Sequence, residues 1–148
     1  MISAMAEGYR ILGDRRYLDA AARSADFLLG TLTRADGRLL RTYRTGTAHL
    51  DAYLEDYAYL AEAFIDLYEA GGAARYLTEA VRLVETILAE FADAESGAFY
   101  STARDHESLI VRQHEGTDGA TMSANAVAAS ALARLSFHLD RPDLRAAA

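Results

Sequence analysis

The stretch His49–Ala70 constrains the fold more than any other part of the chain. Placed on a helix at about 100° per residue, it is apolar around most of its circumference, and most of its charges form one narrow stripe. The stripe consists of Glu55, Glu62, Asp66 and Glu69. A helix with so little polar surface has protein on nearly every side. We therefore expect a central helix and begin it at Asp51, because a carboxylate at the N-cap accepts backbone N–H bonds.

Composition narrows the class of protein. The 148 residues are 51% hydrophobic with a single proline, which favours one helical domain with a real core. The absence of cysteine excludes disulfides, thiolate catalysis and cysteine metal sites. A net charge of −7 without a basic cluster argues against nucleic acid or a membrane as partner. No apolar run approaches the roughly 20 residues of a membrane span, and no signal peptide opens the chain, so we expect a cytoplasmic protein.

Five substantial helices and a truncated sixth are predicted from the apolar spacing. Besides the central helix they are Met1–Leu12, Arg15–Leu32, Ala74–Phe91, Thr121–Leu139 and the start of another at Arg141–Ala148. Short strand-like pieces are expected near Leu39–Tyr43, Ala98–Ser101 and Leu109–Arg112. The fold class is therefore all-α with short β pieces in the loops.

An internal repeat organises these helices. GDRRYLDAAA at Gly13 matches GAARYLTEAV at Gly72, 59 residues later, and a weaker third copy begins at Leu139. Helices that are apolar all round alternate with two-faced helices, which indicates an inner and an outer ring of α/α hairpins. We expect a single partial toroid, about half of a complete one. Its hairpin repeats span about 1–44, 45–103 and 104–148, and the last is truncated.

The segments MISAMAEGYRILGDRRYLDAAARSADFLL, AYLEDYAYLAEAFIDLYEA, GAFYSTARDHESLIVR and TDGATMSANAVAA carry a resemblance. They are similar to the helical region of a family of thioredoxin-domain-containing proteins, which includes the spermatogenesis-associated thioredoxin-like protein. The resemblance implies a six-hairpin α/α toroid akin to that of N-acylglucosamine 2-epimerases and six-hairpin glycosidases. The family's thioredoxin-like domain and its cysteines are absent from this chain. A sugar-related pocket follows only by analogy of fold.

The loops that enter the inner helices line the pocket of such a toroid, and the first offers His49, Glu55, Asp56 and Tyr57. Asp56 lies on the apolar side of the central helix, where a carboxylate is costly unless it is paired or hydrogen-bonded. We expect it to be buried against Arg112, Asn125 or a backbone N–H. Paired carboxylates near an aromatic ring suit acid/base chemistry on a sugar.

Asp56 and Glu55 are thus predicted as catalytic, and Tyr57 and His49 as substrate-binding. In the structural alternative Glu55 supports the first turns and Tyr57 belongs to the core.

The second such loop offers Arg112, His114, Asp118 and Asn125. Asp118 is the third catalytic candidate, and the other three are candidates for substrate binding. Asn125 is the only asparagine in the chain, and a buried amide needs partners. Arg112 ends an apolar strand and is expected to pair with Asp56 or Asp118. In the structural alternative Asp118 forms a turn and Arg112 a structural ion pair.

No pattern for a metal or a cofactor stands out. HxxxH, HExxH and phosphate-binding glycine loops are all missing, so neither is predicted. Two classes of function remain open. The chain is either part of a carbohydrate-binding or carbohydrate-active toroid that takes a sugar-like small molecule, or a non-catalytic helical scaffold. The residues do not decide whether it is an enzyme.

Half a toroid leaves inner helices without neighbours. Met1–Leu12 is expected to expose Ile2, Met5, Tyr9 and Leu12, and apolar patches of that extent rarely stay open. We expect a homodimer that completes the ring around a two-fold axis, with an interface above about 2,000 Å². The alternative is that the missing remainder of a longer parent chain covers these faces.

Overall fold

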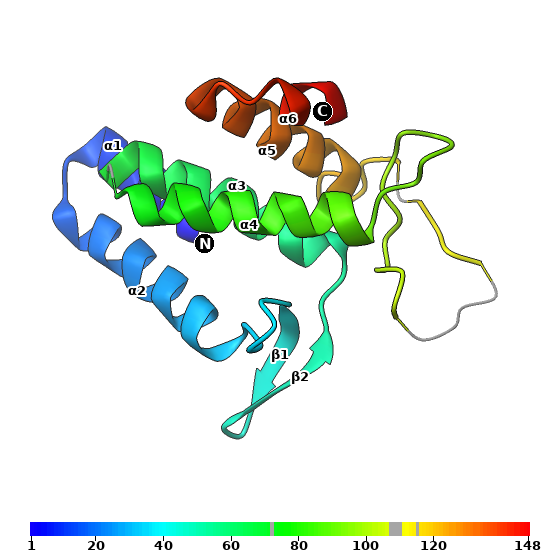
Figure 1. Cartoon of the computed structure of the whole chain (residues 1–148). Helices are drawn as coiled ribbons and strands as arrows, with labels where there is room; N and C mark the ends of the chain where they lie inside the picture. The colour runs from blue at the N-terminus through cyan, green and yellow to red at the C-terminus, as the bar shows by residue number, and fades with distance from the viewer. Residues whose placement is uncertain (72, 107–110, 115) are drawn as a thin grey trace.

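The computed structural model describes residues 1–71, 73–106, 111–114 and 116–148. This part of the chain holds six helices and one β-hairpin, which projects from the helical body (Figure 1). The elements are α1 (Ile2–Leu12), α2 (Arg15–Thr31), β1 (Leu40–Arg44), β2 (Thr47–Asp51), α3 (Leu54–Gly71), α4 (Ala74–Glu90), α5 (Ala124–Leu139) and α6 (Pro142–Ala147). The prediction of a mostly helical chain with five substantial helices and a short sixth is confirmed.

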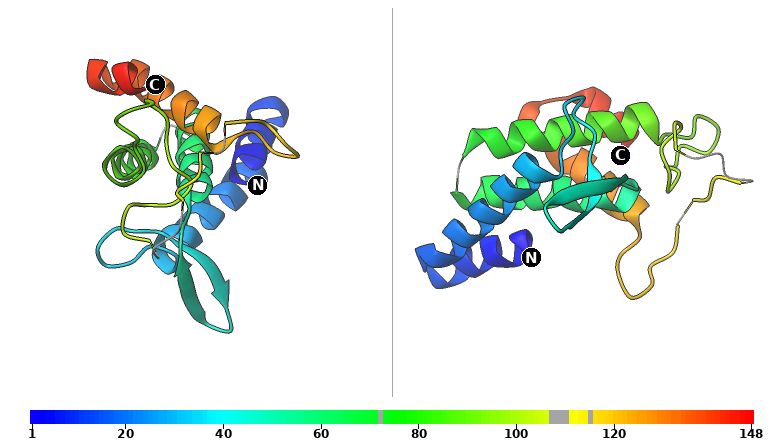
Figure 2. Two further views of the ribbon diagram at one scale, coloured as in Figure 1. Left: turned by 90° about the vertical axis from the view of Figure 1, so that its right-hand side faces the viewer. Right: turned by 90° about the horizontal axis from the view of Figure 1, so that it is seen from below.

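Helix α3 is the centre of the body. It packs against α1, α4 and α5, and the left view of Figure 2 shows it between α1 and α4, with α5 against it. Its buried side chains therefore point in several directions, whereas α2 and α4 each bury one face. The inner helices α1, α3 and α5 alternate with the outer helices α2, α4 and α6, which is the arrangement of an α/α toroid.

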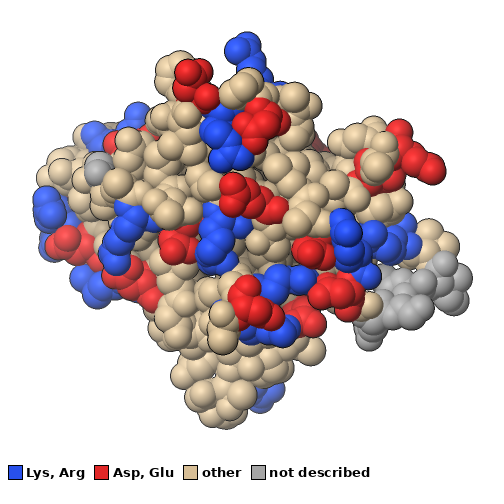
Figure 3. Space-filling view, in the orientation of Figure 1, with Lys and Arg blue, Asp and Glu red and all other residues tan. Residues whose placement is uncertain are grey.

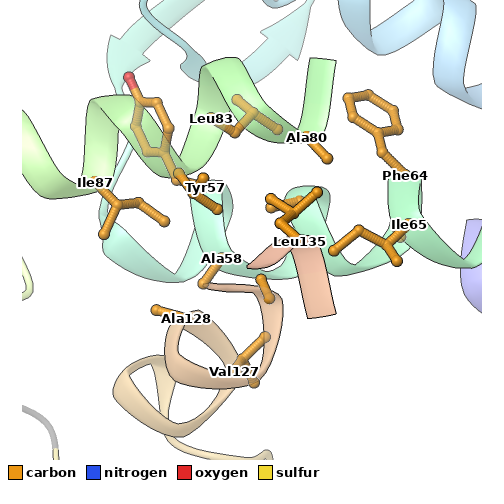
Figure 4. Close-up of a cluster of buried hydrophobic side chains, with 14 of the residues drawn as sticks. Tyr57, Ala58, Phe64, Ile65, Ala80, Leu83, Ile87, Val127, Ala128 and Leu135 are labelled. Carbon is orange, nitrogen blue, oxygen red and sulfur yellow. The ribbon is translucent and has the colours of Figure 1, made fainter. Parts of the chain in front are cut away.

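The core between α3, α4 and α5 is closely packed (Figure 4). Tyr57 of α3 meets Leu83 and Ile87 of α4, and Val127 of α5 lies on the other side of α3. All four side chains are at most 3% exposed. Full burial of one large apolar side chain contributes about 1.5–3 kcal/mol, so this cluster holds the three helices together.

The two complete hairpins share their geometry. Helix α4 begins and ends 59 residues after α2, and α3 ends 59 residues after α1. The turns behind the outer helices match as well, because the N–H of Leu40 donates to the carbonyl of Leu32 at 2.8 Å and that of Tyr100 to Phe91 at 2.8 Å. The inner helices differ in length: α1 has 11 residues and α3 has 18. The whole difference lies at their N-terminal ends.

The prediction that Asp51 caps the central helix is wrong. Asp51 is the last residue of β2, its carboxylate accepts a hydrogen bond from Arg34 at 3.0 Å, and α3 begins only at Leu54. The reason is the hairpin turn at Thr45-Gly46, where φ is +51° and +84°. Two central residues with positive φ make the turn that matches the twist of paired strands, so the pairing continues as far as Asp51.

The three predicted β pieces agree with the structure to different degrees. The piece near Leu39–Tyr43 is β1, shifted by one residue, and its partner β2 was not predicted. The piece at Ala98–Ser101 is reduced to one isolated bridge between Ala92 and Phe99. Leu109 and Ile110 lie outside the described residues, and the rest of that piece is not a strand.

The predicted exposure of α1 is correct only at its end. Leu12 is 64% exposed, but Ile2 is buried and Met5 and Tyr9 are partly buried. The reason is that α1 packs against both α2 and α3, which cover the face expected to be open.

The surface carries both signs of charge. On the face shown in Figure 3, acidic and basic side chains alternate over the helices, while the projecting hairpin is largely uncharged. Along the described ranges, no helix combines the length and the hydropathy of a membrane span.

Candidate functional site

Arg41, Glu55 and Asp56 form an ion-pair cluster where the hairpin meets the first turn of α3. The Nη2 atom of Arg41 lies 2.6 Å from Oε1 of Glu55, and its Nη1 atom lies 2.9 Å from Oδ2 of Asp56. The same guanidinium lies over the ring of Tyr53, 4.8 Å from its centroid, which adds a cation–π contact. Two carboxylates are thereby held beside one another by a single cation from β1.

The carboxylate of Asp56 also caps α3. Its Oδ2 atom accepts the backbone N–H of Tyr53 at 2.9 Å, and Tyr53 directly precedes the helix. This is the backward bond of a capping box, which satisfies a donor that the helix leaves free. Of the three alternative partners predicted for Asp56, the backbone N–H is confirmed, while Arg112 and Asn125 bind backbone groups elsewhere. Asp56 is also half-buried rather than buried, with 28% of its side chain exposed.

The surroundings of Asp56 change its proton affinity. Burial raises the pKa of its carboxyl above the ordinary value, and the Tyr53 N–H and the charge of Arg41 oppose that rise without cancelling it. The charge of Glu55 raises the pKa further. A carboxyl whose pKa moves upward holds a proton closer to neutral pH, which is what a general acid needs.

A cavity of about 780 Å³ opens beside this cluster, between α2, β1, α3 and the start of α1. We call four of its lining residues the polar end: Arg41, Glu55, Asp56 and Tyr59. Across from them α2 contributes Arg23, Ser24 and Phe27. The other lining residues are apolar and form what we call the apolar part: Met1, Ile2, Ala20, Leu28, Leu32, Leu39, Leu40, Leu60 and Ala63. The cavity thus combines a long apolar wall with one carboxylate-bearing end.

The other two residues predicted from the first loop do not line this cavity. Tyr57 is 1% exposed, and its hydroxyl accepts the N–H of Leu39 at 2.8 Å and the Nε–H of Arg38 at 3.3 Å. The structure therefore places Tyr57 in the core. His49 is an exposed residue of β2, and its carbonyl accepts the hydroxyl of Thr42 at 2.9 Å.

Arg112 and His114 gather around Tyr100 instead of around Asp56. The guanidinium of Arg112 lies 4.0 Å from the centroid of the Tyr100 ring and donates to the carbonyl of Thr102. His114 stacks on the same ring at 4.2 Å and pairs with Asp93 at 3.3 Å. The expected ion pair of Arg112 with Asp56 or Asp118 is wrong, because its guanidinium packs on Tyr100 and its Nη2 atom donates to backbone carbonyls.

Asn125 and Asp118 fasten the long loop to α5. The side-chain oxygen of Asn125 accepts the N–H of Phe99 at 2.7 Å, and its amide nitrogen donates to the carbonyl of Phe99 at 2.9 Å. Asp118 accepts the N–H of Ser123 at 2.8 Å, and Ser123 in turn caps α5. The structure therefore does not bring Arg112, Asp118 and Asn125 to the carboxylates of the polar end.

Sequence reasoning missed Arg41 as a residue of the site. A signal for Arg41 existed, because Asp56 on an apolar face needs a cation and the strand before the helix carries several arginines. Tyr59 is partly exposed, lines the cavity and donates its hydroxyl to the carbonyl of Met122 at 2.8 Å. In the described part of the chain, no three His, Asp or Glu residues are placed to hold a metal ion.

The fold defines the chain as part of an α/α toroid of the kind seen in solved carbohydrate-active enzymes. It is similar to cellobiose 2-epimerase from Spirochaeta thermophila, with a TM-score of 0.76 and 21% identity over 99% of this chain and 38% of that one. It is also similar to the GH76 α-mannanase of Bacteroides thetaiotaomicron, with a TM-score of 0.71 and 17% identity over 97% and 35%. At these identities the likeness shows the fold alone.

The curated relatives point to one family. The chain is 36% identical to human spermatogenesis-associated protein 20 over 145 residues, which is 91% of this chain and 18% of that protein. It is 31% identical to an uncharacterised protein of Caenorhabditis elegans over 97% of this chain and 20% of that one. No known family profile matches the chain. The resemblance to the thioredoxin-domain family of spermatogenesis-associated protein 20 is confirmed, and the chain spans about a fifth of the length of these relatives.

Proposed function

We propose that the chain is a toroid segment that binds a sugar-like small molecule at the polar end of the cavity. The observation that carries the proposal is the pair of carboxylates, Glu55 and Asp56, held by Arg41 at the entry of an inner helix and open to a cavity. Carboxylates and a guanidinium are the side chains that hydrogen-bond hydroxyl groups with most strength. Tyr59 and Phe27 add partly exposed aromatic rings to the lining of the same cavity.

The names of the structural neighbours support the same class of ligand, since a mannanase and a cellobiose epimerase both act on sugars. Asp56 is the group best suited to acid/base work, because burial raises the pKa of its carboxyl. Glu55 has a different environment: its side chain is more exposed and contacts Arg41 at 2.6 Å. Two carboxyls in unlike surroundings can divide the roles of acid and base.

The second candidate is a non-catalytic scaffold, and one observation favours it. The carboxylate of Asp56 already caps α3 and binds Arg41, and Asn125 and Asp118 bind backbone groups. In that case these polar residues serve only to join inner helices to loops. The two functions differ in one consequence: only sugar binding requires an affinity that depends on the charge of Asp56.

Sugar binding by the whole chain tests the proposal. Cellobiose and an α-mannan oligosaccharide, titrated to millimolar concentration, should show saturation-transfer NMR signals with the wild-type chain. Asp56→Asn keeps an oxygen that can accept the Tyr53 N–H but removes the charge, so it should weaken binding by about tenfold. Glu95→Gln changes an exposed carboxylate outside the cavity and should bind as the wild type does.

Two results would overturn the proposal in favour of the scaffold. One is the absence of binding by either sugar at millimolar concentration. The other is equal binding by the wild type and by a folded Asp56→Asn variant, because the ligand would then lie elsewhere.

A further inference from the structure

In the second hairpin, the place equivalent to this cavity is filled by the first residues of the inner helix α3. Helix α3 has seven more residues at its N-terminal end than α1, since the two have 18 and 11 residues and end at equivalent positions. These additional residues are Leu54–Leu60. They include Leu54, Tyr57 and Ala58, all at most 1% exposed, which lie between the outer helix α4 and the inner helix α5.

The residues that surround those side chains have equivalents in the first hairpin, and these equivalents line the cavity. Leu83 and Ile87 of α4 and its C-cap residue Phe91 surround Tyr57 (Figure 4), whose ring centroid lies 5.3 Å from that of Phe91. The positions 59 residues earlier are Ser24, Leu28 and Leu32, and all three line the cavity.

The inner wall matches in the same way. Helix α5 ends 68 residues after α3, at Leu139 and Gly71, so its buried residues Val127, Ala128 and Ala131 correspond to the following cavity residues of α3: Tyr59, Leu60 and Ala63. Both walls of the cavity are therefore repeat copies of walls that enclose a helix in the second hairpin.

We propose that the apolar part of the cavity is the docking site of a helical segment that continues α1 upstream, supplied by the remainder of a longer parent chain. Met1 and Ile2, at the start of α1, themselves line the cavity. A segment that extends this helix by six residues advances about 9 Å along the same axis and enters the cavity without a turn. The curated relatives, about a fifth of whose length this chain spans, are long enough to supply it.

The chemistry of the segment follows from its surroundings. It should carry one aliphatic and one large aromatic side chain three residues apart, as Leu54 and Tyr57 are, because the facing residues Leu28, Leu32 and Leu60 are apolar. A second copy of the chain fits less well, since its helices would have to enter beside Met1 from another direction. The inference rests on the repeat positions of the two walls and not on sugar binding at the polar end.

A grafted extension tests the proposal. A copy of Leu54–Tyr59 is placed directly before Met1, after an initiator methionine, so that Met1 takes the position of Leu60. The control extension has the same length but carries serine in place of the copied Leu54 and Tyr57. The chain has no cysteine, so Ser24→Cys provides a unique thiol in the cavity wall. Ser130→Cys, at an exposed position of α5, provides the control thiol.

The expected result is that the apolar extension slows labelling of the Ser24→Cys thiol by about tenfold or more. The serine-containing extension should leave that rate within a small factor of the unextended chain, and the Ser130→Cys thiol should react equally in all three. The thermal midpoint should rise only with the apolar extension. Unchanged labelling with the apolar extension, or equal slowing by both extensions, would overturn the proposal.

Discussion

The hydroxyl of Tyr57 accepts the backbone N–H of Leu39 at 2.8 Å, and both residues are almost fully buried. This bond ties the inner helix α3 to the segment that leads from α2 into β1. A residue of the second hairpin thereby completes the hydrogen bonding of the first. The nearby pair of Arg38 with Asp105, at 2.9 Å, extends the connection to the loop behind α4.

Removal of that hydroxyl should destabilise the chain. Tyr57→Phe leaves the buried N–H of Leu39 without its acceptor, which costs about 1–3 kcal/mol of unfolding free energy. Tyr53→Phe is the matched control, because Tyr53 is 37% exposed and should change stability little. Urea denaturation followed by circular dichroism measures both. Equal stability of Tyr57→Phe and wild type would contradict the role assigned to this bond.

The cap formed by Asp56 gives a second stability prediction. Asp56→Ala removes both the acceptor of the Tyr53 N–H and one partner of Arg41, so we expect a loss of about 1–3 kcal/mol. Asp56→Asn keeps an acceptor at the cap and should lose less. Urea midpoints that decrease in the order wild type, Asp56→Asn, Asp56→Ala support the capping role. An alanine variant as stable as the wild type would refute it.

The two bonds between Asn125 and the backbone of Phe99 predict a strong preference for the amide. Asn125→Asp retains an oxygen toward the Phe99 N–H but turns a carboxylate oxygen toward the Phe99 carbonyl, which accepts an amide hydrogen in the wild type. Both Asn125→Asp and Asn125→Ala should lower the unfolding free energy by about 1–3 kcal/mol. When the pH is lowered from 7, the aspartate variant should regain stability, because a protonated carboxyl can again donate to the Phe99 carbonyl. A stability that does not change with pH would contradict this.

The lowered pKa of Glu69 makes the stability of the fold depend on pH. Burial disfavours its charged form, but hydrogen bonds from His138 and Arg134 outweigh burial and hold the pKa of Glu69 below its ordinary value of 4.5. A pKa that is lower in the folded state gives stability that is present above pH 4.5 and is lost as the pH falls through the folded value. Glu69→Gln should therefore show a smaller loss of unfolding free energy between pH 5 and pH 3 than the wild type. Glu95→Gln, an exposed control, should keep the wild-type profile.

Assembly of the isolated chain is the last prediction. Ile11 and Leu12 at the end of α1 and Phe137 on α5 are 72%, 64% and 85% exposed. We expect a homodimer that sets α1 of one copy against α5 of the other, with an interface above about 2,000 Å². Light scattering at micromolar concentration should give twice the chain mass of 16.1 kDa, and Phe137→Ser should shift it toward the monomer. A stable wild-type monomer would refute the prediction.

The helices and their repeat are determined by the sequence itself. Apolar spacing along a helix is a local property, and the matched segments at Gly13 and Gly72 locate α2 and α4 to within one residue of their observed ends. The same local reasoning selected Glu55 and Asp56, because a carboxylate on an apolar face stands out without knowledge of its partner. Both residues do line the cavity.

Tertiary structure decided the partners and the cavity. Arg41 meets Asp56 across 15 positions and Asn125 meets Phe99 across 26, and neither contact follows from periodicity within one element. The turn at Thr45-Gly46 set the length of the hairpin, which moved the start of α3 from Asp51 to Leu54. A strand register or a contact between elements depends on how separate segments pack, and so only the assembled fold could fix which polar groups meet.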